Sequence, residues 1–441
     1  MSIKVSKFGG TSLASAEQFK KVKEIILSDK TRQYVVPSAP GKRESSDIKV
    51  TDLLYECYNL YTMGSDFQAV LKQISNRYEE IVSGLNLSLD MTPHFDEISS
   101  TISNGTTLDY VASRGEYLNG IILSALINFE FIDAREIIFF TEDGRLDLDK
   151  TKEVMRQRLS TSTHAVIPGF YGSLPNGEVK IFSRGGSDIS GAVVARAIKA
   201  SVYENWTDVS GLLIADPGVV ENPKPIDKIT YRELRELSYM GAKVLHEETI
   251  FPVLEAGIPI NIRNTNRPKD PGTMILKNTK VDTSQIPITG IAGKKDFTVI
   301  AVEKNQMNAQ IGYVRKLLSI FEEKQVSFEH IPSGIDSVSV VVDDQQLKNG
   351  KLEALIAEIK KQCCPDLLEV HPNMALVATV GHGMAYRPGI AAKLFTALSE
   401  GDVNIRMIDQ GASEINIIVG IENDDFEKAI QMIYKAFVPE V

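Results

Sequence analysis

"VSKFGGTSLASAEQF", residues 5–19, places a glycine pair directly after an apolar run and just before the start of a helical pattern. Glycines at the end of a strand let backbone N–H groups approach an anion, because no Cβ stands in the way. The lysine comes before the glycines, so the stretch is not the P-loop pattern, in which the lysine follows them. We predict a phosphate-binding turn, with a solvated lysine beside a plain turn as the alternative. The predicted donors are Lys7, Gly9, Gly10, Thr11 and Ser12.

The composition is that of an ordinary globular protein with more than one core. The chain has 441 residues, of which 43% are apolar and 24% charged, and this length exceeds one typical domain. The formal net charge of −10 argues against nucleic acid or an anionic membrane as the main partner. An anionic substrate would therefore have to meet a local basic cluster inside an acidic protein.

The cysteines and the apolar runs indicate the compartment. The three cysteines, Cys57, Cys363 and Cys364, do not have the spacing of a disulfide framework or a zinc site. The first residues lack the apolar region of a signal peptide, and no apolar run is long enough to span a bilayer. We therefore expect a cytoplasmic protein.

Up to about residue 280, short β-branched runs alternate with amphipathic stretches. Strands are predicted in "IKVSKF", "QYVVPSAPG", "AREIIFF", "HAVIPGFYGS", "SVYENWTDVSGLL" and "IPINIRNT", and helices in "SAEQFKKVKEIIL" and "SDISGAVVARAIKA". Capping boxes are predicted for Ser15 with Gln18 and for Thr230 with Glu233. Strands that alternate with helices favour an α/β domain with a mostly parallel sheet covered on both faces.

The chain from about Gln285 contains an internal repeat. "IGYVRKLLSIFEEKQVSFEHIPSGIDSVSVVVDD" aligns with "PGIAAKLFTALSEGDVNIRMIDQGASEINIIVGI". Gly312 and Gly389, like Val326 and Val403, differ by the same 77 positions. Each copy reads helix, strand, turn, strand, so we predict a pair of ferredoxin-like units.

A second glycine pair lies in "IFSRGGSDISGA", residues 181–192, again between a predicted strand and a predicted helix. The start of such a helix favours an anion, and Arg184 can hold a carboxylate in a bidentate fork. Ser187 and Asp188 follow the glycines. The alternative is a tight turn in which Asp188 only complements the helix dipole.

Three weaker stretches complete the set of candidates. Thr207 and Asp208 end a predicted strand in "NWTDVSGLLIADP" and would lie near a nucleotide or its metal, although a plain polar loop is the alternative. Glu116 in "SRGEYLNG" would receive an ammonium group unless it is simply solvated. Lys243 lies in "GAKVLHEET", where His246 is given no chemical role.

Taken in this order, "KFGGTS", "RGE", "SRGGSD", "WTDVSGLLIADP" and "AKVLHEETIFPVLEAGIPINIRNT" closely resemble the aspartokinases of the amino-acid kinase fold. "ITGIA", "VSVVV" and "NIRMIDQGASEINIIV" resemble the paired ACT regulatory modules of that family. The resemblance covers essentially the whole chain. It implies a catalytic domain at 1–280 and a regulatory region at 285–441. The first ACT unit would span about 300–370 and the second about 371–441, with 285–299 contributing a strand.

The resemblance also implies roles for residues. Lys7 would hold the transferring phosphate within the loop of Gly9, Gly10, Thr11 and Ser12, and Asp188 would organise the lysines. Thr207, Asp208 and Lys243 would hold ATP. Aspartate would be bound by Ser38, Thr51, Glu116 (α-ammonium), Phe170, Arg184 (α-carboxylate) and Ser187. The family often has an aromatic residue at Leu213 and an arginine at Gly218, so this chain departs from it near the nucleotide, and Lys42 and Arg43 have no assigned role.

The implied reaction needs no general base. The side-chain carboxylate of aspartate has an unperturbed pKa of about 3.9, so it is already ionised, and transfer from ATP depends on positioning and charge neutralisation. No protein metal site is expected, because Mg²⁺ would be held mainly by the ATP phosphates. The alternatives are a kinase that acts on another amino acid, such as glutamate, and a non-catalytic amino-acid sensor. A fused homoserine dehydrogenase is not expected, because no G-x-G-x-x-G follows the second ACT unit.

Regulation is expected in the ACT units. Backbone N–H groups near Gly312 suit an effector carboxylate, and Asp336 would meet a cationic side chain, unless it only stabilises its turn. The resemblance favours lysine as the effector and a homodimer, or a dimer of dimers, joined through the ACT units. The implied effector site consists of Met307, Gly312, Tyr313, Asp336 and Val338.

Overall fold

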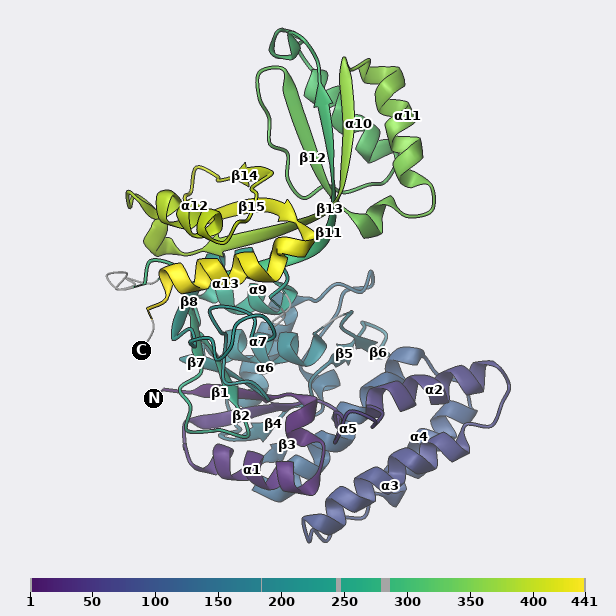
Figure 1. Ribbon diagram of the computed structural model, residues 1–441. Helices are drawn as coiled ribbons and strands as arrows, with labels where there is room; N and C mark the ends of the chain where they lie inside the picture. The colour runs from purple at the N-terminus through teal and green to yellow at the C-terminus, as the bar shows by residue number, and fades with distance from the viewer. Residues whose placement is uncertain (1, 184, 243–246, 279–285, 440–441) are drawn as a thin grey trace. The chain divides into compact units, whose positions relative to one another are not determined.

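The computed structural model describes residues 2–183, 185–242, 247–278 and 286–439 (Figure 1). The chain divides into two compact units. The first consists of the described parts of 1–212, 225–231 and 244–279, and the second of those of 213–224, 232–243 and 280–441. The second unit therefore includes two short segments, 213–224 and 232–243, that precede the repeat in the sequence.

The first unit is built on an eight-stranded sheet in the order β3-β4-β2-β1-β7-β9-β10-β8. All neighbouring strands are parallel except β9 and β10. The strands are β1 (Lys4–Phe8), β2 (Arg32–Pro37), β3 (Glu130–Phe131), β4 (Ala165–Val166), β7 (Val202–Thr207), β8 (Lys228–Thr230), β9 (Ile260–Asn264) and β10 (Thr273–Leu276), and β5 (Tyr171–Ser173) forms a separate hairpin with β6 (Val179–Ile181).

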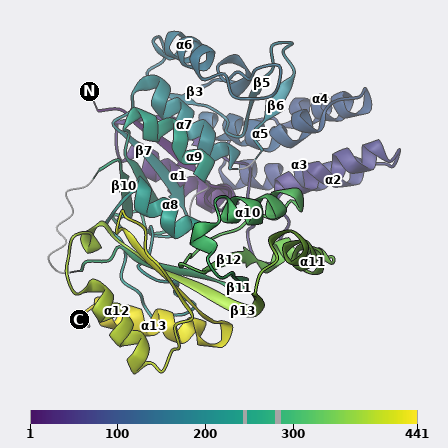
Figure 2. The same cartoon turned by 90° about the horizontal axis from the view of Figure 1, so that it is seen from above.

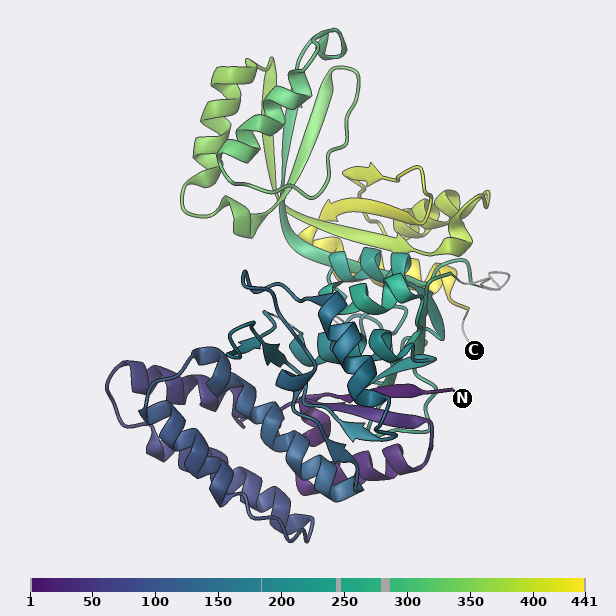
Figure 3. The ribbon, with the colours of Figure 1, turned by 180° about the vertical axis from the view of Figure 1, so that it is seen from behind.

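Helices cover this sheet in two groups. Helix α5 packs against β2, β3 and β4, and α1 packs against α5. Helix α7 packs against β1, β2 and β7, and α6 and α9 pack against α7. Helices α2, α3 and α4 form a bundle with α5 (Figure 3). The bounds are α1 (Ala16–Leu27), α2 (Val50–Thr62), α3 (Gln68–Gly84), α4 (Thr92–Ser103), α5 (Leu108–Ile127), α6 (Leu148–Leu159), α7 (Gly186–Ile198) and α9 (Glu247–Ala256). The predicted α/β class is confirmed.

Two local predictions need correction. Ser15 caps α1 as expected, because its Oγ accepts the N–H of Gln18, but the Gln18 side chain donates to Asn266 at 3.1 Å instead of completing the capping box. The predicted strand "AREIIFF" is wrong: Ala134–Glu136 form a short 3-10 helix capped by Asp133, and Phe139 and Phe140 make only single β-bridges. A side-chain oxygen of Asp133 accepts the Arg135 N–H, so a local turn replaces the strand.

The second unit contains one five-stranded antiparallel sheet in the order β12-β11-β13-β15-β14. Two long strands, β11 (Gly290–Glu303) and β13 (Leu367–Val380), run through both copies of the repeat, and the register of β11 shifts between Lys294 and Phe297. The other strands are β12 (Ser337–Asp343), β14 (Met407–Asp409) and β15 (Asn416–Glu422). The helices are α8 (Tyr231–Tyr239), α10 (Tyr313–Glu323), α11 (Lys351–Cys363), α12 (Ile390–Glu400) and α13 (Phe426–Phe437), and α10 packs on α11 as α12 packs on α13 (Figure 2).

The repeat predicted from the sequence is confirmed in its turns. Gly312 and Gly389 are the N-cap residues of α10 and α12, with φ angles of 84° and 90°. These angles lie in the left-handed region, which glycine enters without a steric cost. Val326 and Val403 are both buried behind the ends of these helices. Among the described residues, no helix is both long and apolar enough to cross a membrane.

Candidate active site

The predicted phosphate turn lies at the carboxyl edge of the sheet. Strand β1 is parallel to β2 on one side and to β7 on the other, and Lys7 pairs in register with Val36 and Asn205. The chain goes from β1 to β2 on one side and enters β7 later on the other, so β1 is a topological switch point. Ligands of open α/β sheets bind at the carboxyl ends of the strands beside such a point.

Lys7 and Asp188 form an ion pair at the centre of this edge. Lys7 Nζ lies 2.5 Å from Asp188 Oδ1, and only 9% of the Lys7 side chain is exposed. Asn205 Nδ2 donates to the same Asp188 oxygen at 2.9 Å, and Tyr203 Oη donates to the Asp188 carbonyl. The structure thus brings the two predicted catalytic residues together. Our sequence reasoning missed Asn205, although its place two residues before Thr207 put it on the same face of the strand.

The glycine pair lies close to the protein's own backbone, and its predicted contact with phosphate stays a prediction. A Cβ on Gly10 would lie 2.9 Å from the Ala39 carbonyl oxygen, so only glycine fits there, whereas a Cβ on Gly9 would have ordinary contacts and would lie 3.8 Å from Lys7 Nζ. The Gly9 N–H donates to the Trp206 carbonyl at 2.9 Å. That N–H already has a partner in this structure, and Lys7 is the charged group beside it.

The two hydroxyls of the turn differ. Thr11 is exposed, whereas Ser12 is buried and shares a hydrogen bond of 2.7 Å with the hydroxyl of Thr265. The Ser12 N–H donates back to the Gly9 carbonyl. Ser12 therefore ties β1 to the segment after β9, and its contact with phosphate stays a prediction.

Glu116 is a buried carboxyl group with an unused oxygen. It lies on α5, is 5% exposed, and its buried Oε2 has no hydrogen-bond partner among the residues that the structure describes. Burial raises its pKa to about 8, and the backbone N–H of Ala39, the Ser187 hydroxyl and the Lys7 charge only partly oppose this. An unpaired buried carboxyl oxygen is costly, so this oxygen is a candidate acceptor for a donor of a ligand.

Ser187 lies beside Glu116, and Gly169 and Phe170 pack against the start of α7, which includes Ser187. Ser187 Oγ lies 3.5 Å from Glu116 Oε1, and a Cβ on Gly169 would lie 2.7 Å from the Ser187 Cβ. Phe170 has a φ of 79°, which is uncommon for an aromatic residue. Its N–H donates to Ser190 Oγ at 3.0 Å, so α7 holds this strained residue in place.

The predicted pocket residues Ser38 and Thr51 lie at the two ends of one segment, residues 38–51, which runs from the end of β2 into the first turn of α2. The Ser38 N–H donates to the Phe8 carbonyl at 3.0 Å, and the Ser38 carbonyl accepts from Asn119 Nδ2 at 2.7 Å. Asn119 lies one helical turn after Glu116 on α5 and was not singled out from the sequence. Thr51 is half-buried in α2.

Other predicted residues fall at the end of β7 or outside the described residues. Thr207 ends β7, and its hydroxyl lies 3.2 Å from an oxygen of the exposed Asp208. Arg184 and Lys243, like His246, lie outside the described residues. Among the described side chains, no group of three or more His, Cys, Asp or Glu residues is placed to hold a metal ion.

The turn around Asp336 in the first repeat, which we call the regulatory turn, is more exposed to solvent than the edge of the sheet at Lys7 and Asp188. Asp336 is exposed, and its Oδ1 accepts the Met307 N–H at 3.2 Å. Met307, Tyr313 and Val338 are buried beside it, and the buried Tyr313 hydroxyl has no partner in the part of the chain that the structure describes. Burial raises the pKa of Tyr313 to about 12. The five predicted effector residues thus lie on or next to one turn, at the start of α10 and of β12.

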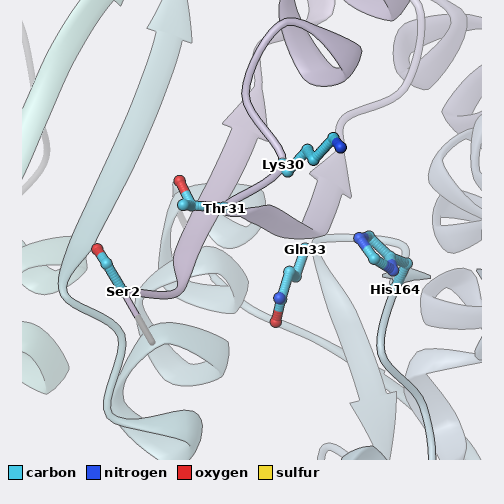
Figure 4. A pocket seen from close by; sticks show the side chains of 5 residues that line it. All are labelled: Ser2, Lys30, Thr31, Gln33 and His164. Atoms are coloured by element: carbon cyan, nitrogen blue, oxygen red, sulfur yellow. The ribbon is translucent and has the colours of Figure 1, made fainter.

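A hollow that the structure shows lies elsewhere. It has a volume of about 610 Å³ and is lined by Ser2, Lys30, Thr31, Gln33 and His164. These residues precede or begin β1, β2 and β4, at the amino edge of the sheet, and their side chains spread apart rather than converge (Figure 4). This hollow is therefore at the opposite end of the strands from Lys7 and Asp188.

Comparison with known proteins gives the class of protein that this fold and edge define. The model of the amino acid kinase family matches residues 2–264, and the model of the ACT domain matches residues 377–437. The chain is 37% identical to aspartokinase 3 of Bacillus subtilis over 449 residues, covering 99% of this chain and 98% of that protein. The chain belongs to the aspartokinase family.

Solved structures agree with this assignment. The structure of aspartate kinase from Clostridium acetobutylicum superimposes with a TM-score of 0.92 and 59% identity, covering 99% of this chain and 100% of that one. E. coli aspartokinase III, 26% identical, covers 99% of this chain and 100% of that one in two complexes. The complex with aspartate and ADP has a TM-score of 0.74, and the complex with lysine and aspartate has one of 0.75.

Proposed function

We propose that the protein transfers the γ-phosphoryl group of ATP to the side-chain carboxylate of L-aspartate and so forms 4-phospho-L-aspartate. This would be the first step in the biosynthesis of lysine, threonine and methionine, in the cytoplasm. The observation that carries the proposal is the buried Oε2 of Glu116, which has no partner within the described part of the chain, on a carboxyl group that the Lys7 charge reaches. An α-ammonium group would supply the missing donor, and Lys7 would face the reacting phosphate.

Charge neutralisation would supply most of the catalysis. The acceptor carboxylate and the ATP phosphates repel each other, and Lys7, with only 9% of its side chain exposed, would offset this in a site with little water. Asp188 and Asn205 hold the Lys7 ammonium group in one arrangement, so little reorganisation is needed during transfer. Because the acceptor is already ionised, no residue has to remove a proton from it.

The other predicted site residues would bind either aspartate or ATP. The α-carboxylate of aspartate would be held by Arg184, and Ser38, Thr51, Phe170 and Ser187 would close the pocket. ATP would be bound by the loop of Gly9, Gly10, Thr11 and Ser12 and by Thr207, Asp208 and Lys243. The position of the glycine pair at the carboxyl end of β1, with Gly9 beside Lys7 Nζ, and the exposure of Asp208 after β7 support these places. Mg²⁺ would arrive on the ATP phosphates and neutralise charge there.

We propose lysine as the feedback effector, bound at Met307, Gly312, Tyr313, Asp336 and Val338 in a homodimer, or dimer of dimers, joined through the ACT units. The structure of E. coli aspartokinase III with lysine and aspartate supports the choice of lysine. In this chain, Asp336 Oδ1 already accepts one N–H, so an effector cation would share this carboxylate with the turn.

A substrate panel tests the proposed acceptor. ADP release is measured with ATP and Mg²⁺ and either aspartate or glutamate, at several lysine concentrations. Aspartate should be used at least a hundredfold more efficiently than glutamate, and lysine should inhibit. Equal use of glutamate would make the protein a kinase of another specificity. No ADP release with either amino acid would favour the sensor.

A further inference from the structure

The segment of residues 38–49 connects β2 with α2 and lies between two functional regions. It begins with Ser38 and leads into Thr51, both of which we assign to the aspartate pocket, so the present inference rests on the proposed function. The Gly41 N–H donates to the Gly10 carbonyl at 2.8 Å. A Cβ on Gly41 would lie 2.5 Å from the carbonyl carbon of Gly10. The segment therefore rests directly on the phosphate loop, backbone against backbone.

One buried side chain fastens this segment from the other side. Arg77 lies on α3 and is 5% exposed. Its Nη2 donates to the Gly41 carbonyl, and its Nη1 donates to the Ile48 carbonyl at 2.7 Å. The same guanidinium lies 3.1 Å from Asp47. The planar guanidinium thus holds both ends of the loop at once, which a single ammonium cannot do.

The burial of Arg77 makes its contacts with this segment costly to break. Burying a charged group is costly unless it is paired and hydrogen-bonded. Here the two terminal nitrogens of Arg77 meet one carboxylate and two carbonyls, while its Nε has no partner among the described residues. Asp47 has a second cation, because Arg43 Nε lies 3.0 Å from it. A shift of the segment would leave further buried donors of Arg77 without acceptors, and this cost opposes such a shift.

We propose that Arg77 is a positioning residue for phosphoryl transfer. By fixing Gly41 and Ile48, it holds the segment that carries Ser38 and Thr51 in register with Gly10 of the phosphate loop. The contacts of Arg77 are to Gly41, Ile48 and Asp47, none of which is assigned to a substrate. Arg77 acts through the backbone that aligns the acceptor pocket with the donor phosphate, where a misplacement of about 1 Å costs about a hundredfold in rate.

Steady-state kinetics of Arg77→Met and Arg77→Lys test the proposal. Methionine keeps the apolar stem and removes every donor, while Asp47 keeps Arg43 as its partner. For Arg77→Met we expect the KM for aspartate to rise about tenfold or more and kcat to fall severalfold, with the KM for ATP within about threefold. Arg77→Lys should lie between this variant and the wild type. A purely structural role would lower the unfolding temperature and leave the constants of the folded enzyme unchanged.

Lys72→Met is the matched control. Lys72 lies on the same helix in an exposed ion pair with Glu79, 64% of its side chain being exposed, so its loss should leave all constants unchanged. The proposal is wrong if Arg77→Met, folded by circular dichroism, has the aspartate KM and kcat of the wild type. If Arg77→Met does not fold, a folded Arg77→Lys with wild-type constants overturns the proposal equally. If the wild type used glutamate instead of aspartate, the proposed function would fall, but the same comparison run with glutamate would still decide the role of Arg77.

Discussion

Glu116 on α5 and Asp336 in the first ACT turn are two acidic side chains predicted to receive a cation, and their surroundings differ. Glu116 is buried, has an oxygen without a partner, and has a pKa raised to about 8. Asp336 is exposed, and one of its oxygens caps the Met307 N–H. An arrangement that is costly without a ligand indicates a binding site more strongly than one that is already satisfied.

The same contrast holds for the regions around them. At the proposed catalytic edge, Lys7, Asp188 and Asn205 form a mostly buried set of contacts, so we expect the loss of any of them to lower the rate of the reaction. In the regulatory turn, the groups that face solvent can change without disturbing a core. Substitutions should therefore have large effects on catalysis at the first place and small, conditional effects on inhibition at the second.

The largest effect is expected for Lys7→Ala. If Lys7 neutralises charge on the transferred group, as we propose, kcat should fall by about two or more orders of magnitude. The unfolding temperature should also fall, because Lys7 is buried and its loss leaves Asp188 without its ion pair, so kcat is compared on folded protein. The measurement is kcat at saturating aspartate and ATP, and a variant with near-normal kcat would remove Lys7 from the reaction.

Arg184 provides the next comparison, because an α-amino acid needs a cation as well as the anion of Glu116. Arg184→Ala should raise the KM for aspartate by tenfold or more and change the KM for ATP much less. Arg184→Lys should also be poor, because an ammonium does not reproduce the bidentate fork. Initial rates with each substrate varied in turn check this, and a larger effect on ATP would contradict the assignment.

In the absence of substrate, Glu116 should make the stability of the protein depend on pH. Its pKa in the folded protein, about 8, is above the ordinary glutamate value of 4.5. The folded state therefore binds the proton more tightly, and this group's contribution to stability is lost as pH rises from about 4.5 to about 8. Glu116→Gln removes this loss, so the variant should unfold at a higher temperature than the wild type at pH 8.

Thermal unfolding of both proteins at pH 6 and pH 8 measures the effect, and the difference between them should grow with pH. The same variant should lose aspartate binding, because a neutral amide does not pair with an ammonium. A Glu116→Gln protein that is no more stable than the wild type at pH 8 and binds aspartate normally would show that Glu116 is only a packed side chain.

The smallest effect on the reaction itself is expected in the regulatory turn. Asp336→Ala, or a bulky residue at Gly312, should weaken lysine inhibition while leaving uninhibited kcat nearly intact. A differential of about 1.4 kcal/mol in effector binding between two states shifts their equilibrium about tenfold. Activity is measured against lysine concentration, and inhibition curves that match the wild type would place the effector site elsewhere.

The sequence predicted those features that depend on local pattern. The alternating strands, the glycine turns and the 77-residue repeat each have a periodicity or a residue type that a local conformation requires, and Gly312 and Gly389 show it in their φ angles. The ion pair of Lys7 with Asp188 was anticipated only through the family resemblance, because the two residues are far apart in the chain.

The misses have a common physical cause. Asn205, Asn119 and Arg77 act through contacts between segments that are distant in the sequence, and an Asn or Arg in a strand or helix has no local signature of such a role. The strand predicted at 134–140 failed because the Asp133 side chain stabilises a turn there, which apolar periodicity alone does not reveal. Gln18 failed to complete its capping box because Asn266 competes for its amide.

The most direct test is to identify the atom that receives the phosphate. The reaction with ATP, Mg²⁺ and aspartate is run in hydroxylamine, which converts an acyl phosphate into a hydroxamate, and the hydroxamate is identified by NMR for the wild type and for Lys7→Ala. We predict the hydroxamate of the side-chain carboxylate from the wild type and about a hundredfold less from the variant. A hydroxamate of the α-carboxylate, or ADP release without any hydroxamate, would contradict the account.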